Sequence, residues 1–328
     1  MGTCAYRLLD KLRRSQQARL CLESGALDTR ELRTISNWVR SNRVIRPRRS
    51  MYVEAAFWRE THRNEQERMI LRTASAMHPN WVFCRESAAL AHGLYVSWSR
   101  LSKLHVAQNN AQRSGSTAQT LWHRVMDTVP EHVDGIRVTP LVQTAADCMR
   151  ALPFGESLAV ADSALRTLSE DRSSFVEAIH GFVLGKRGAQ KAVAVARHAN
   201  PLSESGGESI ARSIVLQEGF ELPRLQVELP NLSNPDWPYR ADMLWRGTRR
   251  WPVDGELDGY EKYKNSAMTQ GRELDELLFR QRIRDSRASL EGVTVMRFEF
   301  SDLTHPERFV ALLERFGIPR SEKPVRLP

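Results

Sequence analysis

The sequence predicts a multidomain α+β protein. Its 328 residues exceed one ordinary domain, so two or three domains are expected. Segments with helical and with strand periodicity both recur along the chain, which favours a mixed fold class. Proline, glycine and serine cluster in NPLSESGGES at 200–209, between two helical stretches, and mark the clearest boundary. We therefore expect three domains, at 1–60, 61–200 and 201–320.

Composition and charge narrow the class of protein. A hydrophobic content of 41% and a charged content of 27% are typical of a globular chain. The apolar runs are too short to span a membrane, and the start lacks a secretion signal, so we expect a cytoplasmic protein without a membrane partner. The net charge is +9, and residues 1–72 hold 16 Lys and Arg against 8 Asp and Glu. DNA is the expected partner.

Residues 1–60 show the element order of a winged helix-turn-helix. Helical spacing predicts a helix in 5–24, a short helix capped by Asp28 or Thr29, and another helix at 34–42. A two-stranded ribbon is expected at 44–53. In that fold the last helix enters the major groove and the wing contacts phosphates. The expected DNA contacts are Arg40, Arg43, Arg46, Arg48 and Arg49. The alternative is a small helical cap whose arginines are only solvated.

The run TRELRTISNWVRSNRVIRPRRSMYV, within the first 55 residues or so, resembles a known segment. It is similar to the N-terminal winged helix of type IV (AbiEi-type) antitoxins and related actinobacterial regulators. The resemblance implies a DNA-binding regulator and leaves open a cognate toxin or neighbouring-operon protein as partner. Ser50 is a departure, because a glycine is commoner there. A homodimer also stays open, although no heptad seam is present.

Residues 61–200 read as an α+β connecting domain. A helix is expected at 85–95, short strands at 103–108 and 135–139, and several helices after residue 141. The histidines lack metal-ligand spacing, so we expect them at the surface or hydrogen-bonded in the core. Asp147 and Asp162 are interpreted as buried hydrogen-bonding or capping groups rather than as catalytic acids.

Residues 201–320 change to the order helix, three strands, helix, strand, helix. The expected elements are a helix at 207–220, strands at 224–230, 239–246 and 251–260, a helix at 268–292, a strand at 293–300 and a helix at 306–317. If PVDGELDG is a strand, Asp254, Glu256 and Asp258 all point to one side and repel one another. Either a solvated strand edge or a divalent cation would explain why they are kept.

Asp242 lies on the strand before these carboxylates. Mg²⁺ takes oxygen ligands and is commonly held by one or two carboxylates with waters and substrate phosphate. We therefore expect Asp242 and Glu256 to ligate Mg²⁺, with Mn²⁺ as an alternative cation. Such an ion polarises a phosphodiester and lowers the pKa of an attacking water. Leu257, between the acids, is expected to point into the core.

The strand Asp followed by Glu-Leu-Asp resembles the core of PD-(D/E)XK nucleases. Residues 200–316 are similar to the branch related to very-short-patch-repair endonucleases, at Ser203, Glu204, Glu208, Arg212, Gly219, Pro223, Gln226, Asp242, Trp245, Glu256, Asp258, Gly259, Lys262, Tyr263, Arg284, Asp285, Val295 and Arg297. The resemblance implies a restriction-endonuclease-like α/β core with a mixed sheet and a metal-dependent nuclease activity. Asp258 stands where the family usually has the lysine that positions the nucleophilic water. Lys262 is the candidate substitute.

Several of these residues keep two interpretations. Asp258 and Lys262 would orient the water. Glu208 either faces the metal or forms a capping box and pairs with Arg212. Gln281, Arg282 and Arg284 either hold the scissile strand or form a solvated basic face. Asp254 lies outside the pattern and is interpreted as a solvated strand-end acid.

The expected function is a DNA-binding protein with a metal-dependent endonuclease-like domain. An antitoxin-like transcriptional regulator with a catalytically silent nuclease fold is the alternative. Action on RNA or on a nucleotide is a third, weaker interpretation.

Overall fold

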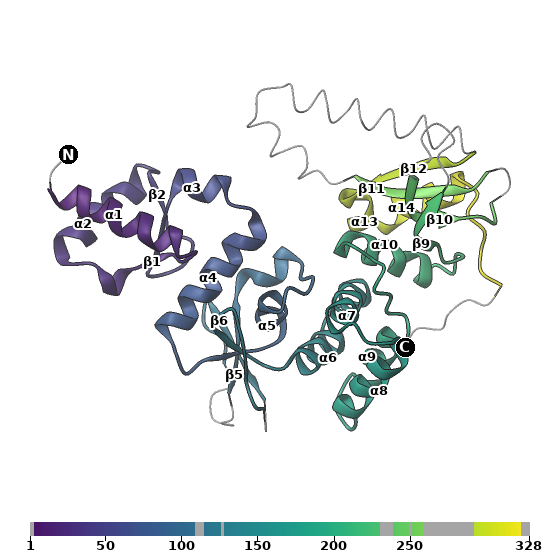
Figure 1. Cartoon of the computed structure of the whole chain (residues 1–328), viewed down its shortest axis with the longest axis horizontal. Coiled ribbons are helices and arrows are strands. Elements are labelled where there is room, and N and C mark those ends of the chain that lie inside the picture. The colour runs from purple at the N-terminus through teal and green to yellow at the C-terminus, as the bar shows by residue number, and fades with distance from the viewer. Residues whose placement is uncertain are drawn as a thin grey trace. The chain divides into compact units, whose positions relative to one another are not determined.

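The computed structural model describes residues 3–108, 115–125, 128–229, 239–248, 251–258 and 292–322. The fold is mixed α+β, and the chain forms two compact units, Met1–Cys148 and Met149–Pro328 (Figure 1). Within the described residues, no helix is both long enough and apolar enough to cross a membrane.

The boundary between the units differs from the expected one. It falls within α6 (Leu141–Ala151), whereas the cluster at 200–209 lies inside the second unit. The helices between these two positions pack with the second unit, because buried Asp162 of α7 (Phe154–Leu168) is paired with Arg212 of α10 (Gly206–Gln217). The Pro-Gly-Ser cluster therefore marks a turn before α10 and not a domain linker.

The start of the first unit packs two helices against a small sheet. Helices α1 (Thr3–Gln17) and α2 (Thr29–Arg40) accompany strands β1 (Leu22–Glu23), β2 (Val44–Ile45) and β3 (Met51–Glu54), in the order β1-β3-β2. Their shared core consists of Leu8, Leu12, Leu22, Ile35, Val44 and Tyr52.

The two short helices expected on either side of residue 33 are one helix, so the predicted three-helix order is wrong. Asp28 caps α2 by accepting hydrogen bonds from the N–H groups of Arg30 and Glu31, and Glu31 completes the capping box. No proline or glycine interrupts the helix after this start. A 3₁₀ turn, η1 (Ser24–Ala26), precedes it.

The turn between β2 and β3 explains the departure at Ser50. Ser50 has φ +67°, in the left-handed region that favours glycine. Serine thus occupies a position whose backbone conformation favours glycine.

The rest of the first unit is a mixed five-stranded sheet with helices. Its elements are α3 (Ala55–Glu60), α4 (Arg63–Met77), β4 (Val82–Phe83), α5 (Arg85–Ala91), η2 (Trp98–Ser102), β5 (Leu104–Gln108), β6 (Thr120–Arg124), β7 (Glu131–Val133) and β8 (Ile136–Val138). The strand order is β6-β5-β4-β8-β7. Asp134 and Gly135, both with positive φ, form the two-residue turn that joins β7 to β8.

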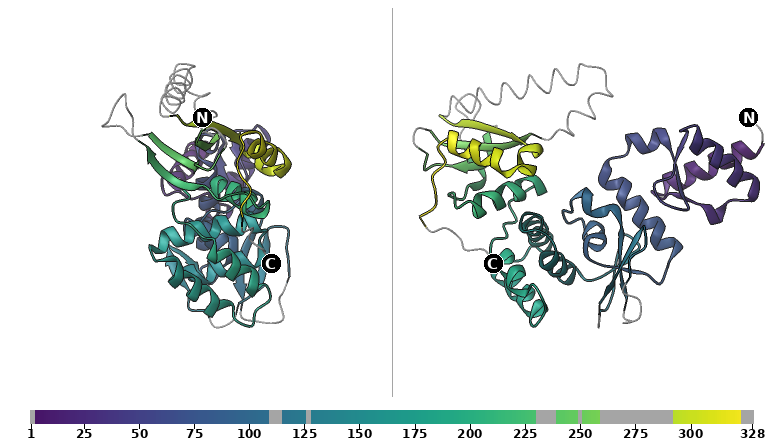
Figure 2. Two further views of the ribbon diagram at one scale, coloured as in Figure 1. Left: turned by 90° about the vertical axis from the view of Figure 1, so that its right-hand side faces the viewer. Right: turned by 180° about the vertical axis from the view of Figure 1, so that it is seen from behind.

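The second unit joins helices to a four-stranded sheet (Figure 2). Besides α7 and α10 it contains α8 (Arg172–Val183), α9 (Ala189–Arg197), β9 (Arg224–Leu229), β10 (Tyr239–Trp245), β11 (Val253–Asp258), β12 (Thr294–Glu299), α13 (Phe300–Thr304) and α14 (Pro306–Arg315). The order is β12-β11-β10-β9, with β11 parallel to β12 and the other neighbours antiparallel. This is the strand sequence expected for residues 201–320; the predicted helix at 268–292 lies almost wholly outside the described residues.

One core joins this sheet to α10, α13 and α14. Its buried residues include Ala211, Val215, Met243, Trp245, Met296, Phe298, Leu303, Phe309 and Leu313. Leu257 packs against the same core, as expected from the sequence. Gly207 lets the first turn of α10 approach β11 closely, because a Cβ atom there would lie 2.1 Å from Leu257 Cδ2. This close approach places the next residue, Glu208, beside the sheet.

Candidate functional site

The three carboxylates of β11 are linked by two side chains from neighbouring strands. The Tyr239 hydroxyl donates to Asp254 and lies 3.2 Å from Glu256 Oε1. Arg297 lies 3.0 Å from Glu256 Oε2 and 2.7 Å from Asp258 Oδ1. The carboxylates therefore lie on one side of the strand, as the alternation predicts. Tyr239 and Arg297 therefore relieve the repulsion among the three carboxylates. Both residues lie outside the segment PVDGELDG, so that segment alone does not reveal them.

The interpretation of Asp254 as a solvated strand-end acid is wrong. Its side chain is 0% exposed, and its Oδ1 accepts a hydrogen bond from the Met243 N–H. Burial raises the pKa of Asp254 to about 7; the Glu256 and Asp242 carboxylates contribute to the rise, and the bonds from Tyr239 and Met243 oppose it. Asp254 is thus an acid that takes up a proton near neutral pH.

Glu208 has the capping role that the sequence left open. The Ser205 hydroxyl accepts from the Glu208 N–H, and the Glu208 carboxylate accepts from Ser205 Oγ and from the Glu204 N–H. The suggested pairing with Arg212 is wrong, because Arg212 Nη1 lies 2.7 Å from Asp162. Burial raises the pKa of Glu208, and the Asp242 and Glu204 carboxylates raise it further, against these hydrogen bonds. Glu208 therefore also lies within electrostatic range of Asp242.

Asp242 lies next to Gln226, a residue with a strained backbone conformation. Gln226 of β9 lies opposite Asp242 in the strand register, with φ +51°, and its Nε2 is 3.4 Å from Asp242 Oδ1. Gln226 Oε1 is buried and makes no hydrogen bond to any residue that the structure describes. Strain of this kind concentrates at functional sites, and it singles out a residue to which the sequence assigned no role.

The residues fit a hard cation in chemistry but are not assembled as a ligand set. Asp242, Glu256 and Glu208 offer carboxylate oxygens, the ligands that Mg²⁺ prefers. Burial is the main cause of the raised pKa values of Asp254 and Glu208, and neighbouring carboxylates raise both further. A cation would relieve that second contribution. Over the described ranges, however, no group of three or more Asp, Glu, His or Cys side chains is arranged to hold a metal ion.

Four of the predicted site residues are not among those that the structure describes. Lys262, Gln281, Arg282 and Arg284 lie outside the described residues.

The first unit carries most of the expected DNA contacts at its surface. Arg40, Arg43, Arg46 and Arg49 are exposed, and the Arg43 guanidinium lies 4.3 Å from the centre of the Trp38 ring. Arg48 is the exception, and its interpretation as a phosphate contact is wrong. It is buried, and its guanidinium donates to the Leu101 and Ser102 carbonyl oxygens at 2.7 and 3.0 Å. Arg48 thus joins the hairpin to the rest of the first unit.

One face of α2 contains polar residues that were not predicted from the sequence, next to the expected contact Arg40. A hollow of about 510 Å³ is lined by Thr29, Leu32, Arg33, Ser36, Asn37 and Arg40. These positions follow the helical repeat, which could have revealed them. No acidic side chain lines the hollow, so it offers hydrogen-bond donors, acceptors and positive charge together.

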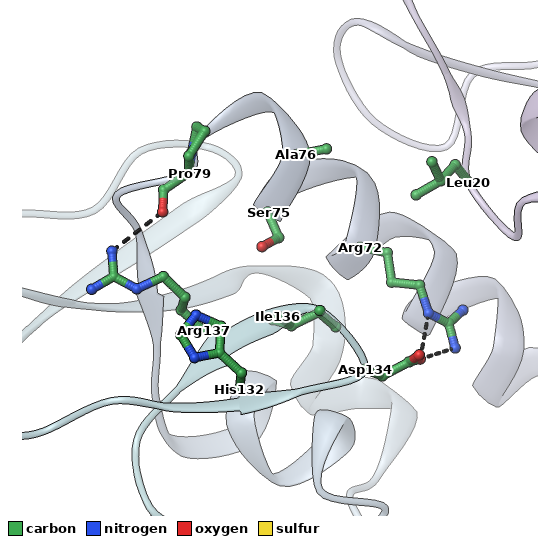
Figure 3. Close-up of a pocket in the computed structure, with 10 residues that line it drawn as sticks. Leu20, Arg72, Ser75, Ala76, Pro79, His132, Asp134, Ile136 and Arg137 are labelled. Carbon is green, nitrogen blue, oxygen red and sulfur yellow. Dashed lines mark hydrogen bonds and ion pairs between the residues drawn. The ribbon is translucent and has the colours of Figure 1, made fainter.

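A second hollow of the first unit, of about 410 Å³, lies between α4 and the β7–β8 hairpin (Figure 3). Its Arg72 is held by Asp134 Oδ2, 2.6 Å from Nε, and by Glu65 Oε1, 2.8 Å from Nη1. Arg137 donates to the Pro79 carbonyl oxygen. Its arginines therefore have partners within the fold, and we interpret these contacts as structural.

Two histidines that are separated in sequence meet on neighbouring strands. His105 Nδ1 lies 2.8 Å from Glu86 Oε2 and 3.1 Å from His123 Nε2. Burial lowers the pKa of His123 to about 4, and the nearby Arg85 and His105 lower it further. His123 is therefore neutral at physiological pH. Parallel strands brought the pair together, so no spacing along the chain signals it.

Comparison with known proteins gives little beyond this geometry. No family model matches the chain, and no solved structure matches it. Two curated proteins of Mycobacterium tuberculosis, the uncharacterized protein MT2308 of strain CDC 1551 / Oshkosh and the uncharacterized protein Rv2248 of strain H37Rv, are each 29% identical over 137 residues. The match covers 42% of this chain and 49% of each relative, so the chain spans about half the length of the relatives it matches.

Proposed function

We propose that this chain is a DNA-binding protein whose second unit hydrolyses phosphodiester bonds with a divalent cation, as an endonuclease of PD-(D/E)XK type. The observation that carries the proposal is the arrangement of the acids. Asp242 and Glu256 lie on neighbouring antiparallel strands of a mixed four-stranded sheet, and Glu208 of the preceding helix lies within electrostatic range of Asp242.

The chemistry follows from these groups. In hydrolysis, the oxygen of a water joins phosphorus, the bridging P–O bond breaks, and the departing oxygen takes a proton. Asp242 and Glu256 would hold the cation, which when bound neutralises phosphate charge and lowers the pKa of water. Asp258 lies beside Glu256 and would orient the water, together with Lys262. Arg282 and Arg284 stay proposed contacts to the cleaved strand, with Gln281 and the acid Glu208 in assisting roles.

The exposed arginines of the first unit support the DNA-binding part of the proposal. We expect Arg33→Ala and Arg40→Ala each to weaken binding to a 30-base-pair duplex, by about 1–3 kcal/mol where the arginine reads a base. For a phosphate contact, the slope of log affinity against log salt falls by about one. Fluorescence anisotropy at several salt concentrations measures both. Arg224→Ala, an exposed arginine of the second unit, is the control; equal affinities for all variants would exclude α2 as the reading helix.

A specific observation also favours the second candidate, an antitoxin-like regulator with a catalytically silent fold. The β11 carboxylates already have internal partners in Tyr239 and Arg297. The described residues also lack an assembled ligand set. This candidate predicts specific, metal-independent binding to the protein's own promoter without cleavage.

Cleavage separates the two candidates. Purified full-length protein is incubated with supercoiled and linear DNA in Mg²⁺ or Mn²⁺, alongside Glu256→Ala and Glu228→Ala. Glu228 is an exposed acid of the same sheet, so its substitution is a matched control. We expect cleavage by the parent and by Glu228→Ala, and a loss of at least about 100-fold in Glu256→Ala and in EDTA. Tight DNA binding without cleavage in either metal would favour the regulator.

A further inference from the structure

Arg297 of β12 places a positive charge beside the carboxylates of the neighbouring strand β11. Arg297 is the partner of Glu256 in the parallel register of β11 and β12, so the backbone ladder holds the two residues side by side. Its two terminal nitrogens contact different carboxylates, Nη2 with Glu256 at 3.0 Å and Nη1 with Asp258 at 2.7 Å. One guanidinium therefore spans both positions of the Glu-Leu-Asp element.

Arginine suits this position for a chemical reason. Its guanidinium stays charged at any physiological pH, and its planar fork fits two carboxylates at once, which an ammonium group cannot do with the same rigidity. Asp258, which replaces a lysine of the resembled nucleases, supplies the second carboxylate that orients the fork. Glu256, Asp258 and Arg297 thus form one ion-paired cluster.

Arg297 is also accessible to a ligand. Its side chain is 24% exposed. With Asp258, it lines a hollow of about 550 Å³ beside α14, whose wall includes the exposed Arg308 and Arg315 and the acids Glu299 and Asp302.

We propose that Arg297 is the positioning cation of the phosphodiester site, in place of the missing lysine. It holds the Glu256 and Asp258 carboxylates in fixed directions, and it presents positive charge to a phosphate oxygen of the bound nucleic acid. This inference rests on the proposed nuclease function and identifies the residue that makes its site competent without a lysine at position 258.

The test moves the positive side chain from position 297 on β12 to position 258 on β11. Full-length Arg297→Met, Arg297→Lys and the double variant Asp258→Lys/Arg297→Met are compared with the parent for nicking of supercoiled DNA in Mn²⁺. Mn²⁺ affinity and thermal midpoint are measured for each. We expect Arg297→Met to lose at least about 100-fold in nicking, Arg297→Lys to lose less, and the double variant to recover at least tenfold over Arg297→Met. Arg224→Met removes an exposed charge and serves as control.

Each outcome bears on the inference. A merely structural Arg297 predicts loss of thermal stability and no recovery on transplanting the lysine, and that result overturns the proposal. Arg297→Met nicking within threefold of the parent overturns it as well. In both cases the parent still nicks DNA, so the proposed function stands. A parent that neither binds Mn²⁺ nor nicks DNA overturns the function and the role of Arg297 together.

Discussion

Arg212→Ala should destabilise the second unit by about 3–5 kcal/mol, the usual cost of removing one partner from a buried ion pair. Arg212 and Asp162 are 5% and 1% exposed. Arg212 Nη1 lies 2.7 Å from Asp162 Oδ2, and Nη2 donates to the His198 carbonyl oxygen. Without the guanidinium, Asp162 keeps only neutral donors, the Ser209 hydroxyl and the Asn200 N–H. Urea unfolding followed by tryptophan fluorescence measures the loss.

The double variant Asp162→Leu/Arg212→Met tests the reason for that loss. Replacing both partners by apolar side chains removes the uncompensated charge, so we expect it to be less destabilised than either single variant. Arg224→Ala removes an exposed arginine of the same unit and should change stability by less than about 0.5 kcal/mol. A loss below about 1 kcal/mol in Arg212→Ala would show that the pair does not join α7 to α10.

Asp254→Asn should remove a large part of the pH dependence of stability, measured in EDTA. The pKa of Asp254 is about 7 in the fold against 3.8 for the free group, so the fold favours the protonated acid. Its contribution is therefore fully present below about pH 4 and is lost as the pH rises through about 7. The difference corresponds to about 4 kcal/mol at 1.36 kcal/mol per pKa unit. Asparagine keeps an acceptor for the Met243 N–H and cannot ionise.

Urea unfolding at a series of pH values between 4 and 8 compares the two proteins. We expect the parent to lose stability relative to Asp254→Asn as the pH rises, and the variant to be the more stable at pH 8. Glu228→Gln, at an exposed position of β9 in the same sheet, is the control and should follow the parent. Parallel profiles of stability against pH for the parent and Asp254→Asn would mean that folding does not raise the pKa of Asp254.

Much of the second unit could be predicted from local pattern. The alternation in PVDGELDG predicts that three acids share one side of a strand, and Tyr239 and Arg297 link all three there. The spacing of Ser205 and Glu208 predicts the capping box at the start of α10. These features depend on residues close in sequence, where spacing and geometry correspond directly.

Apart from the split of α2 into two helices, the failures involve partners distant in the chain. Asp254 looked solvated because Tyr239, its hydrogen-bond partner, comes from another strand. Arg48 looked like a wing contact because nothing near it in sequence indicates the carbonyl oxygens of Leu101 and Ser102. Turn composition near residue 200 likewise does not reveal that Asp162 and Arg212 join the flanking helices. Pattern identifies elements, and tertiary pairing then decides which polar residues remain available.

The central claim is that the acids of β11 serve a divalent cation and not only Tyr239 and Arg297. Titration of Mn²⁺ into the parent, Glu256→Ala and Glu228→Ala without DNA, followed by the electron paramagnetic resonance of free Mn²⁺, tests it directly. We predict one bound ion in the parent and in Glu228→Ala, and an affinity at least about tenfold lower in Glu256→Ala, where a carboxylate ligand is lost. Equal binding by all three proteins, or none by the parent, would contradict the claim and favour the regulator.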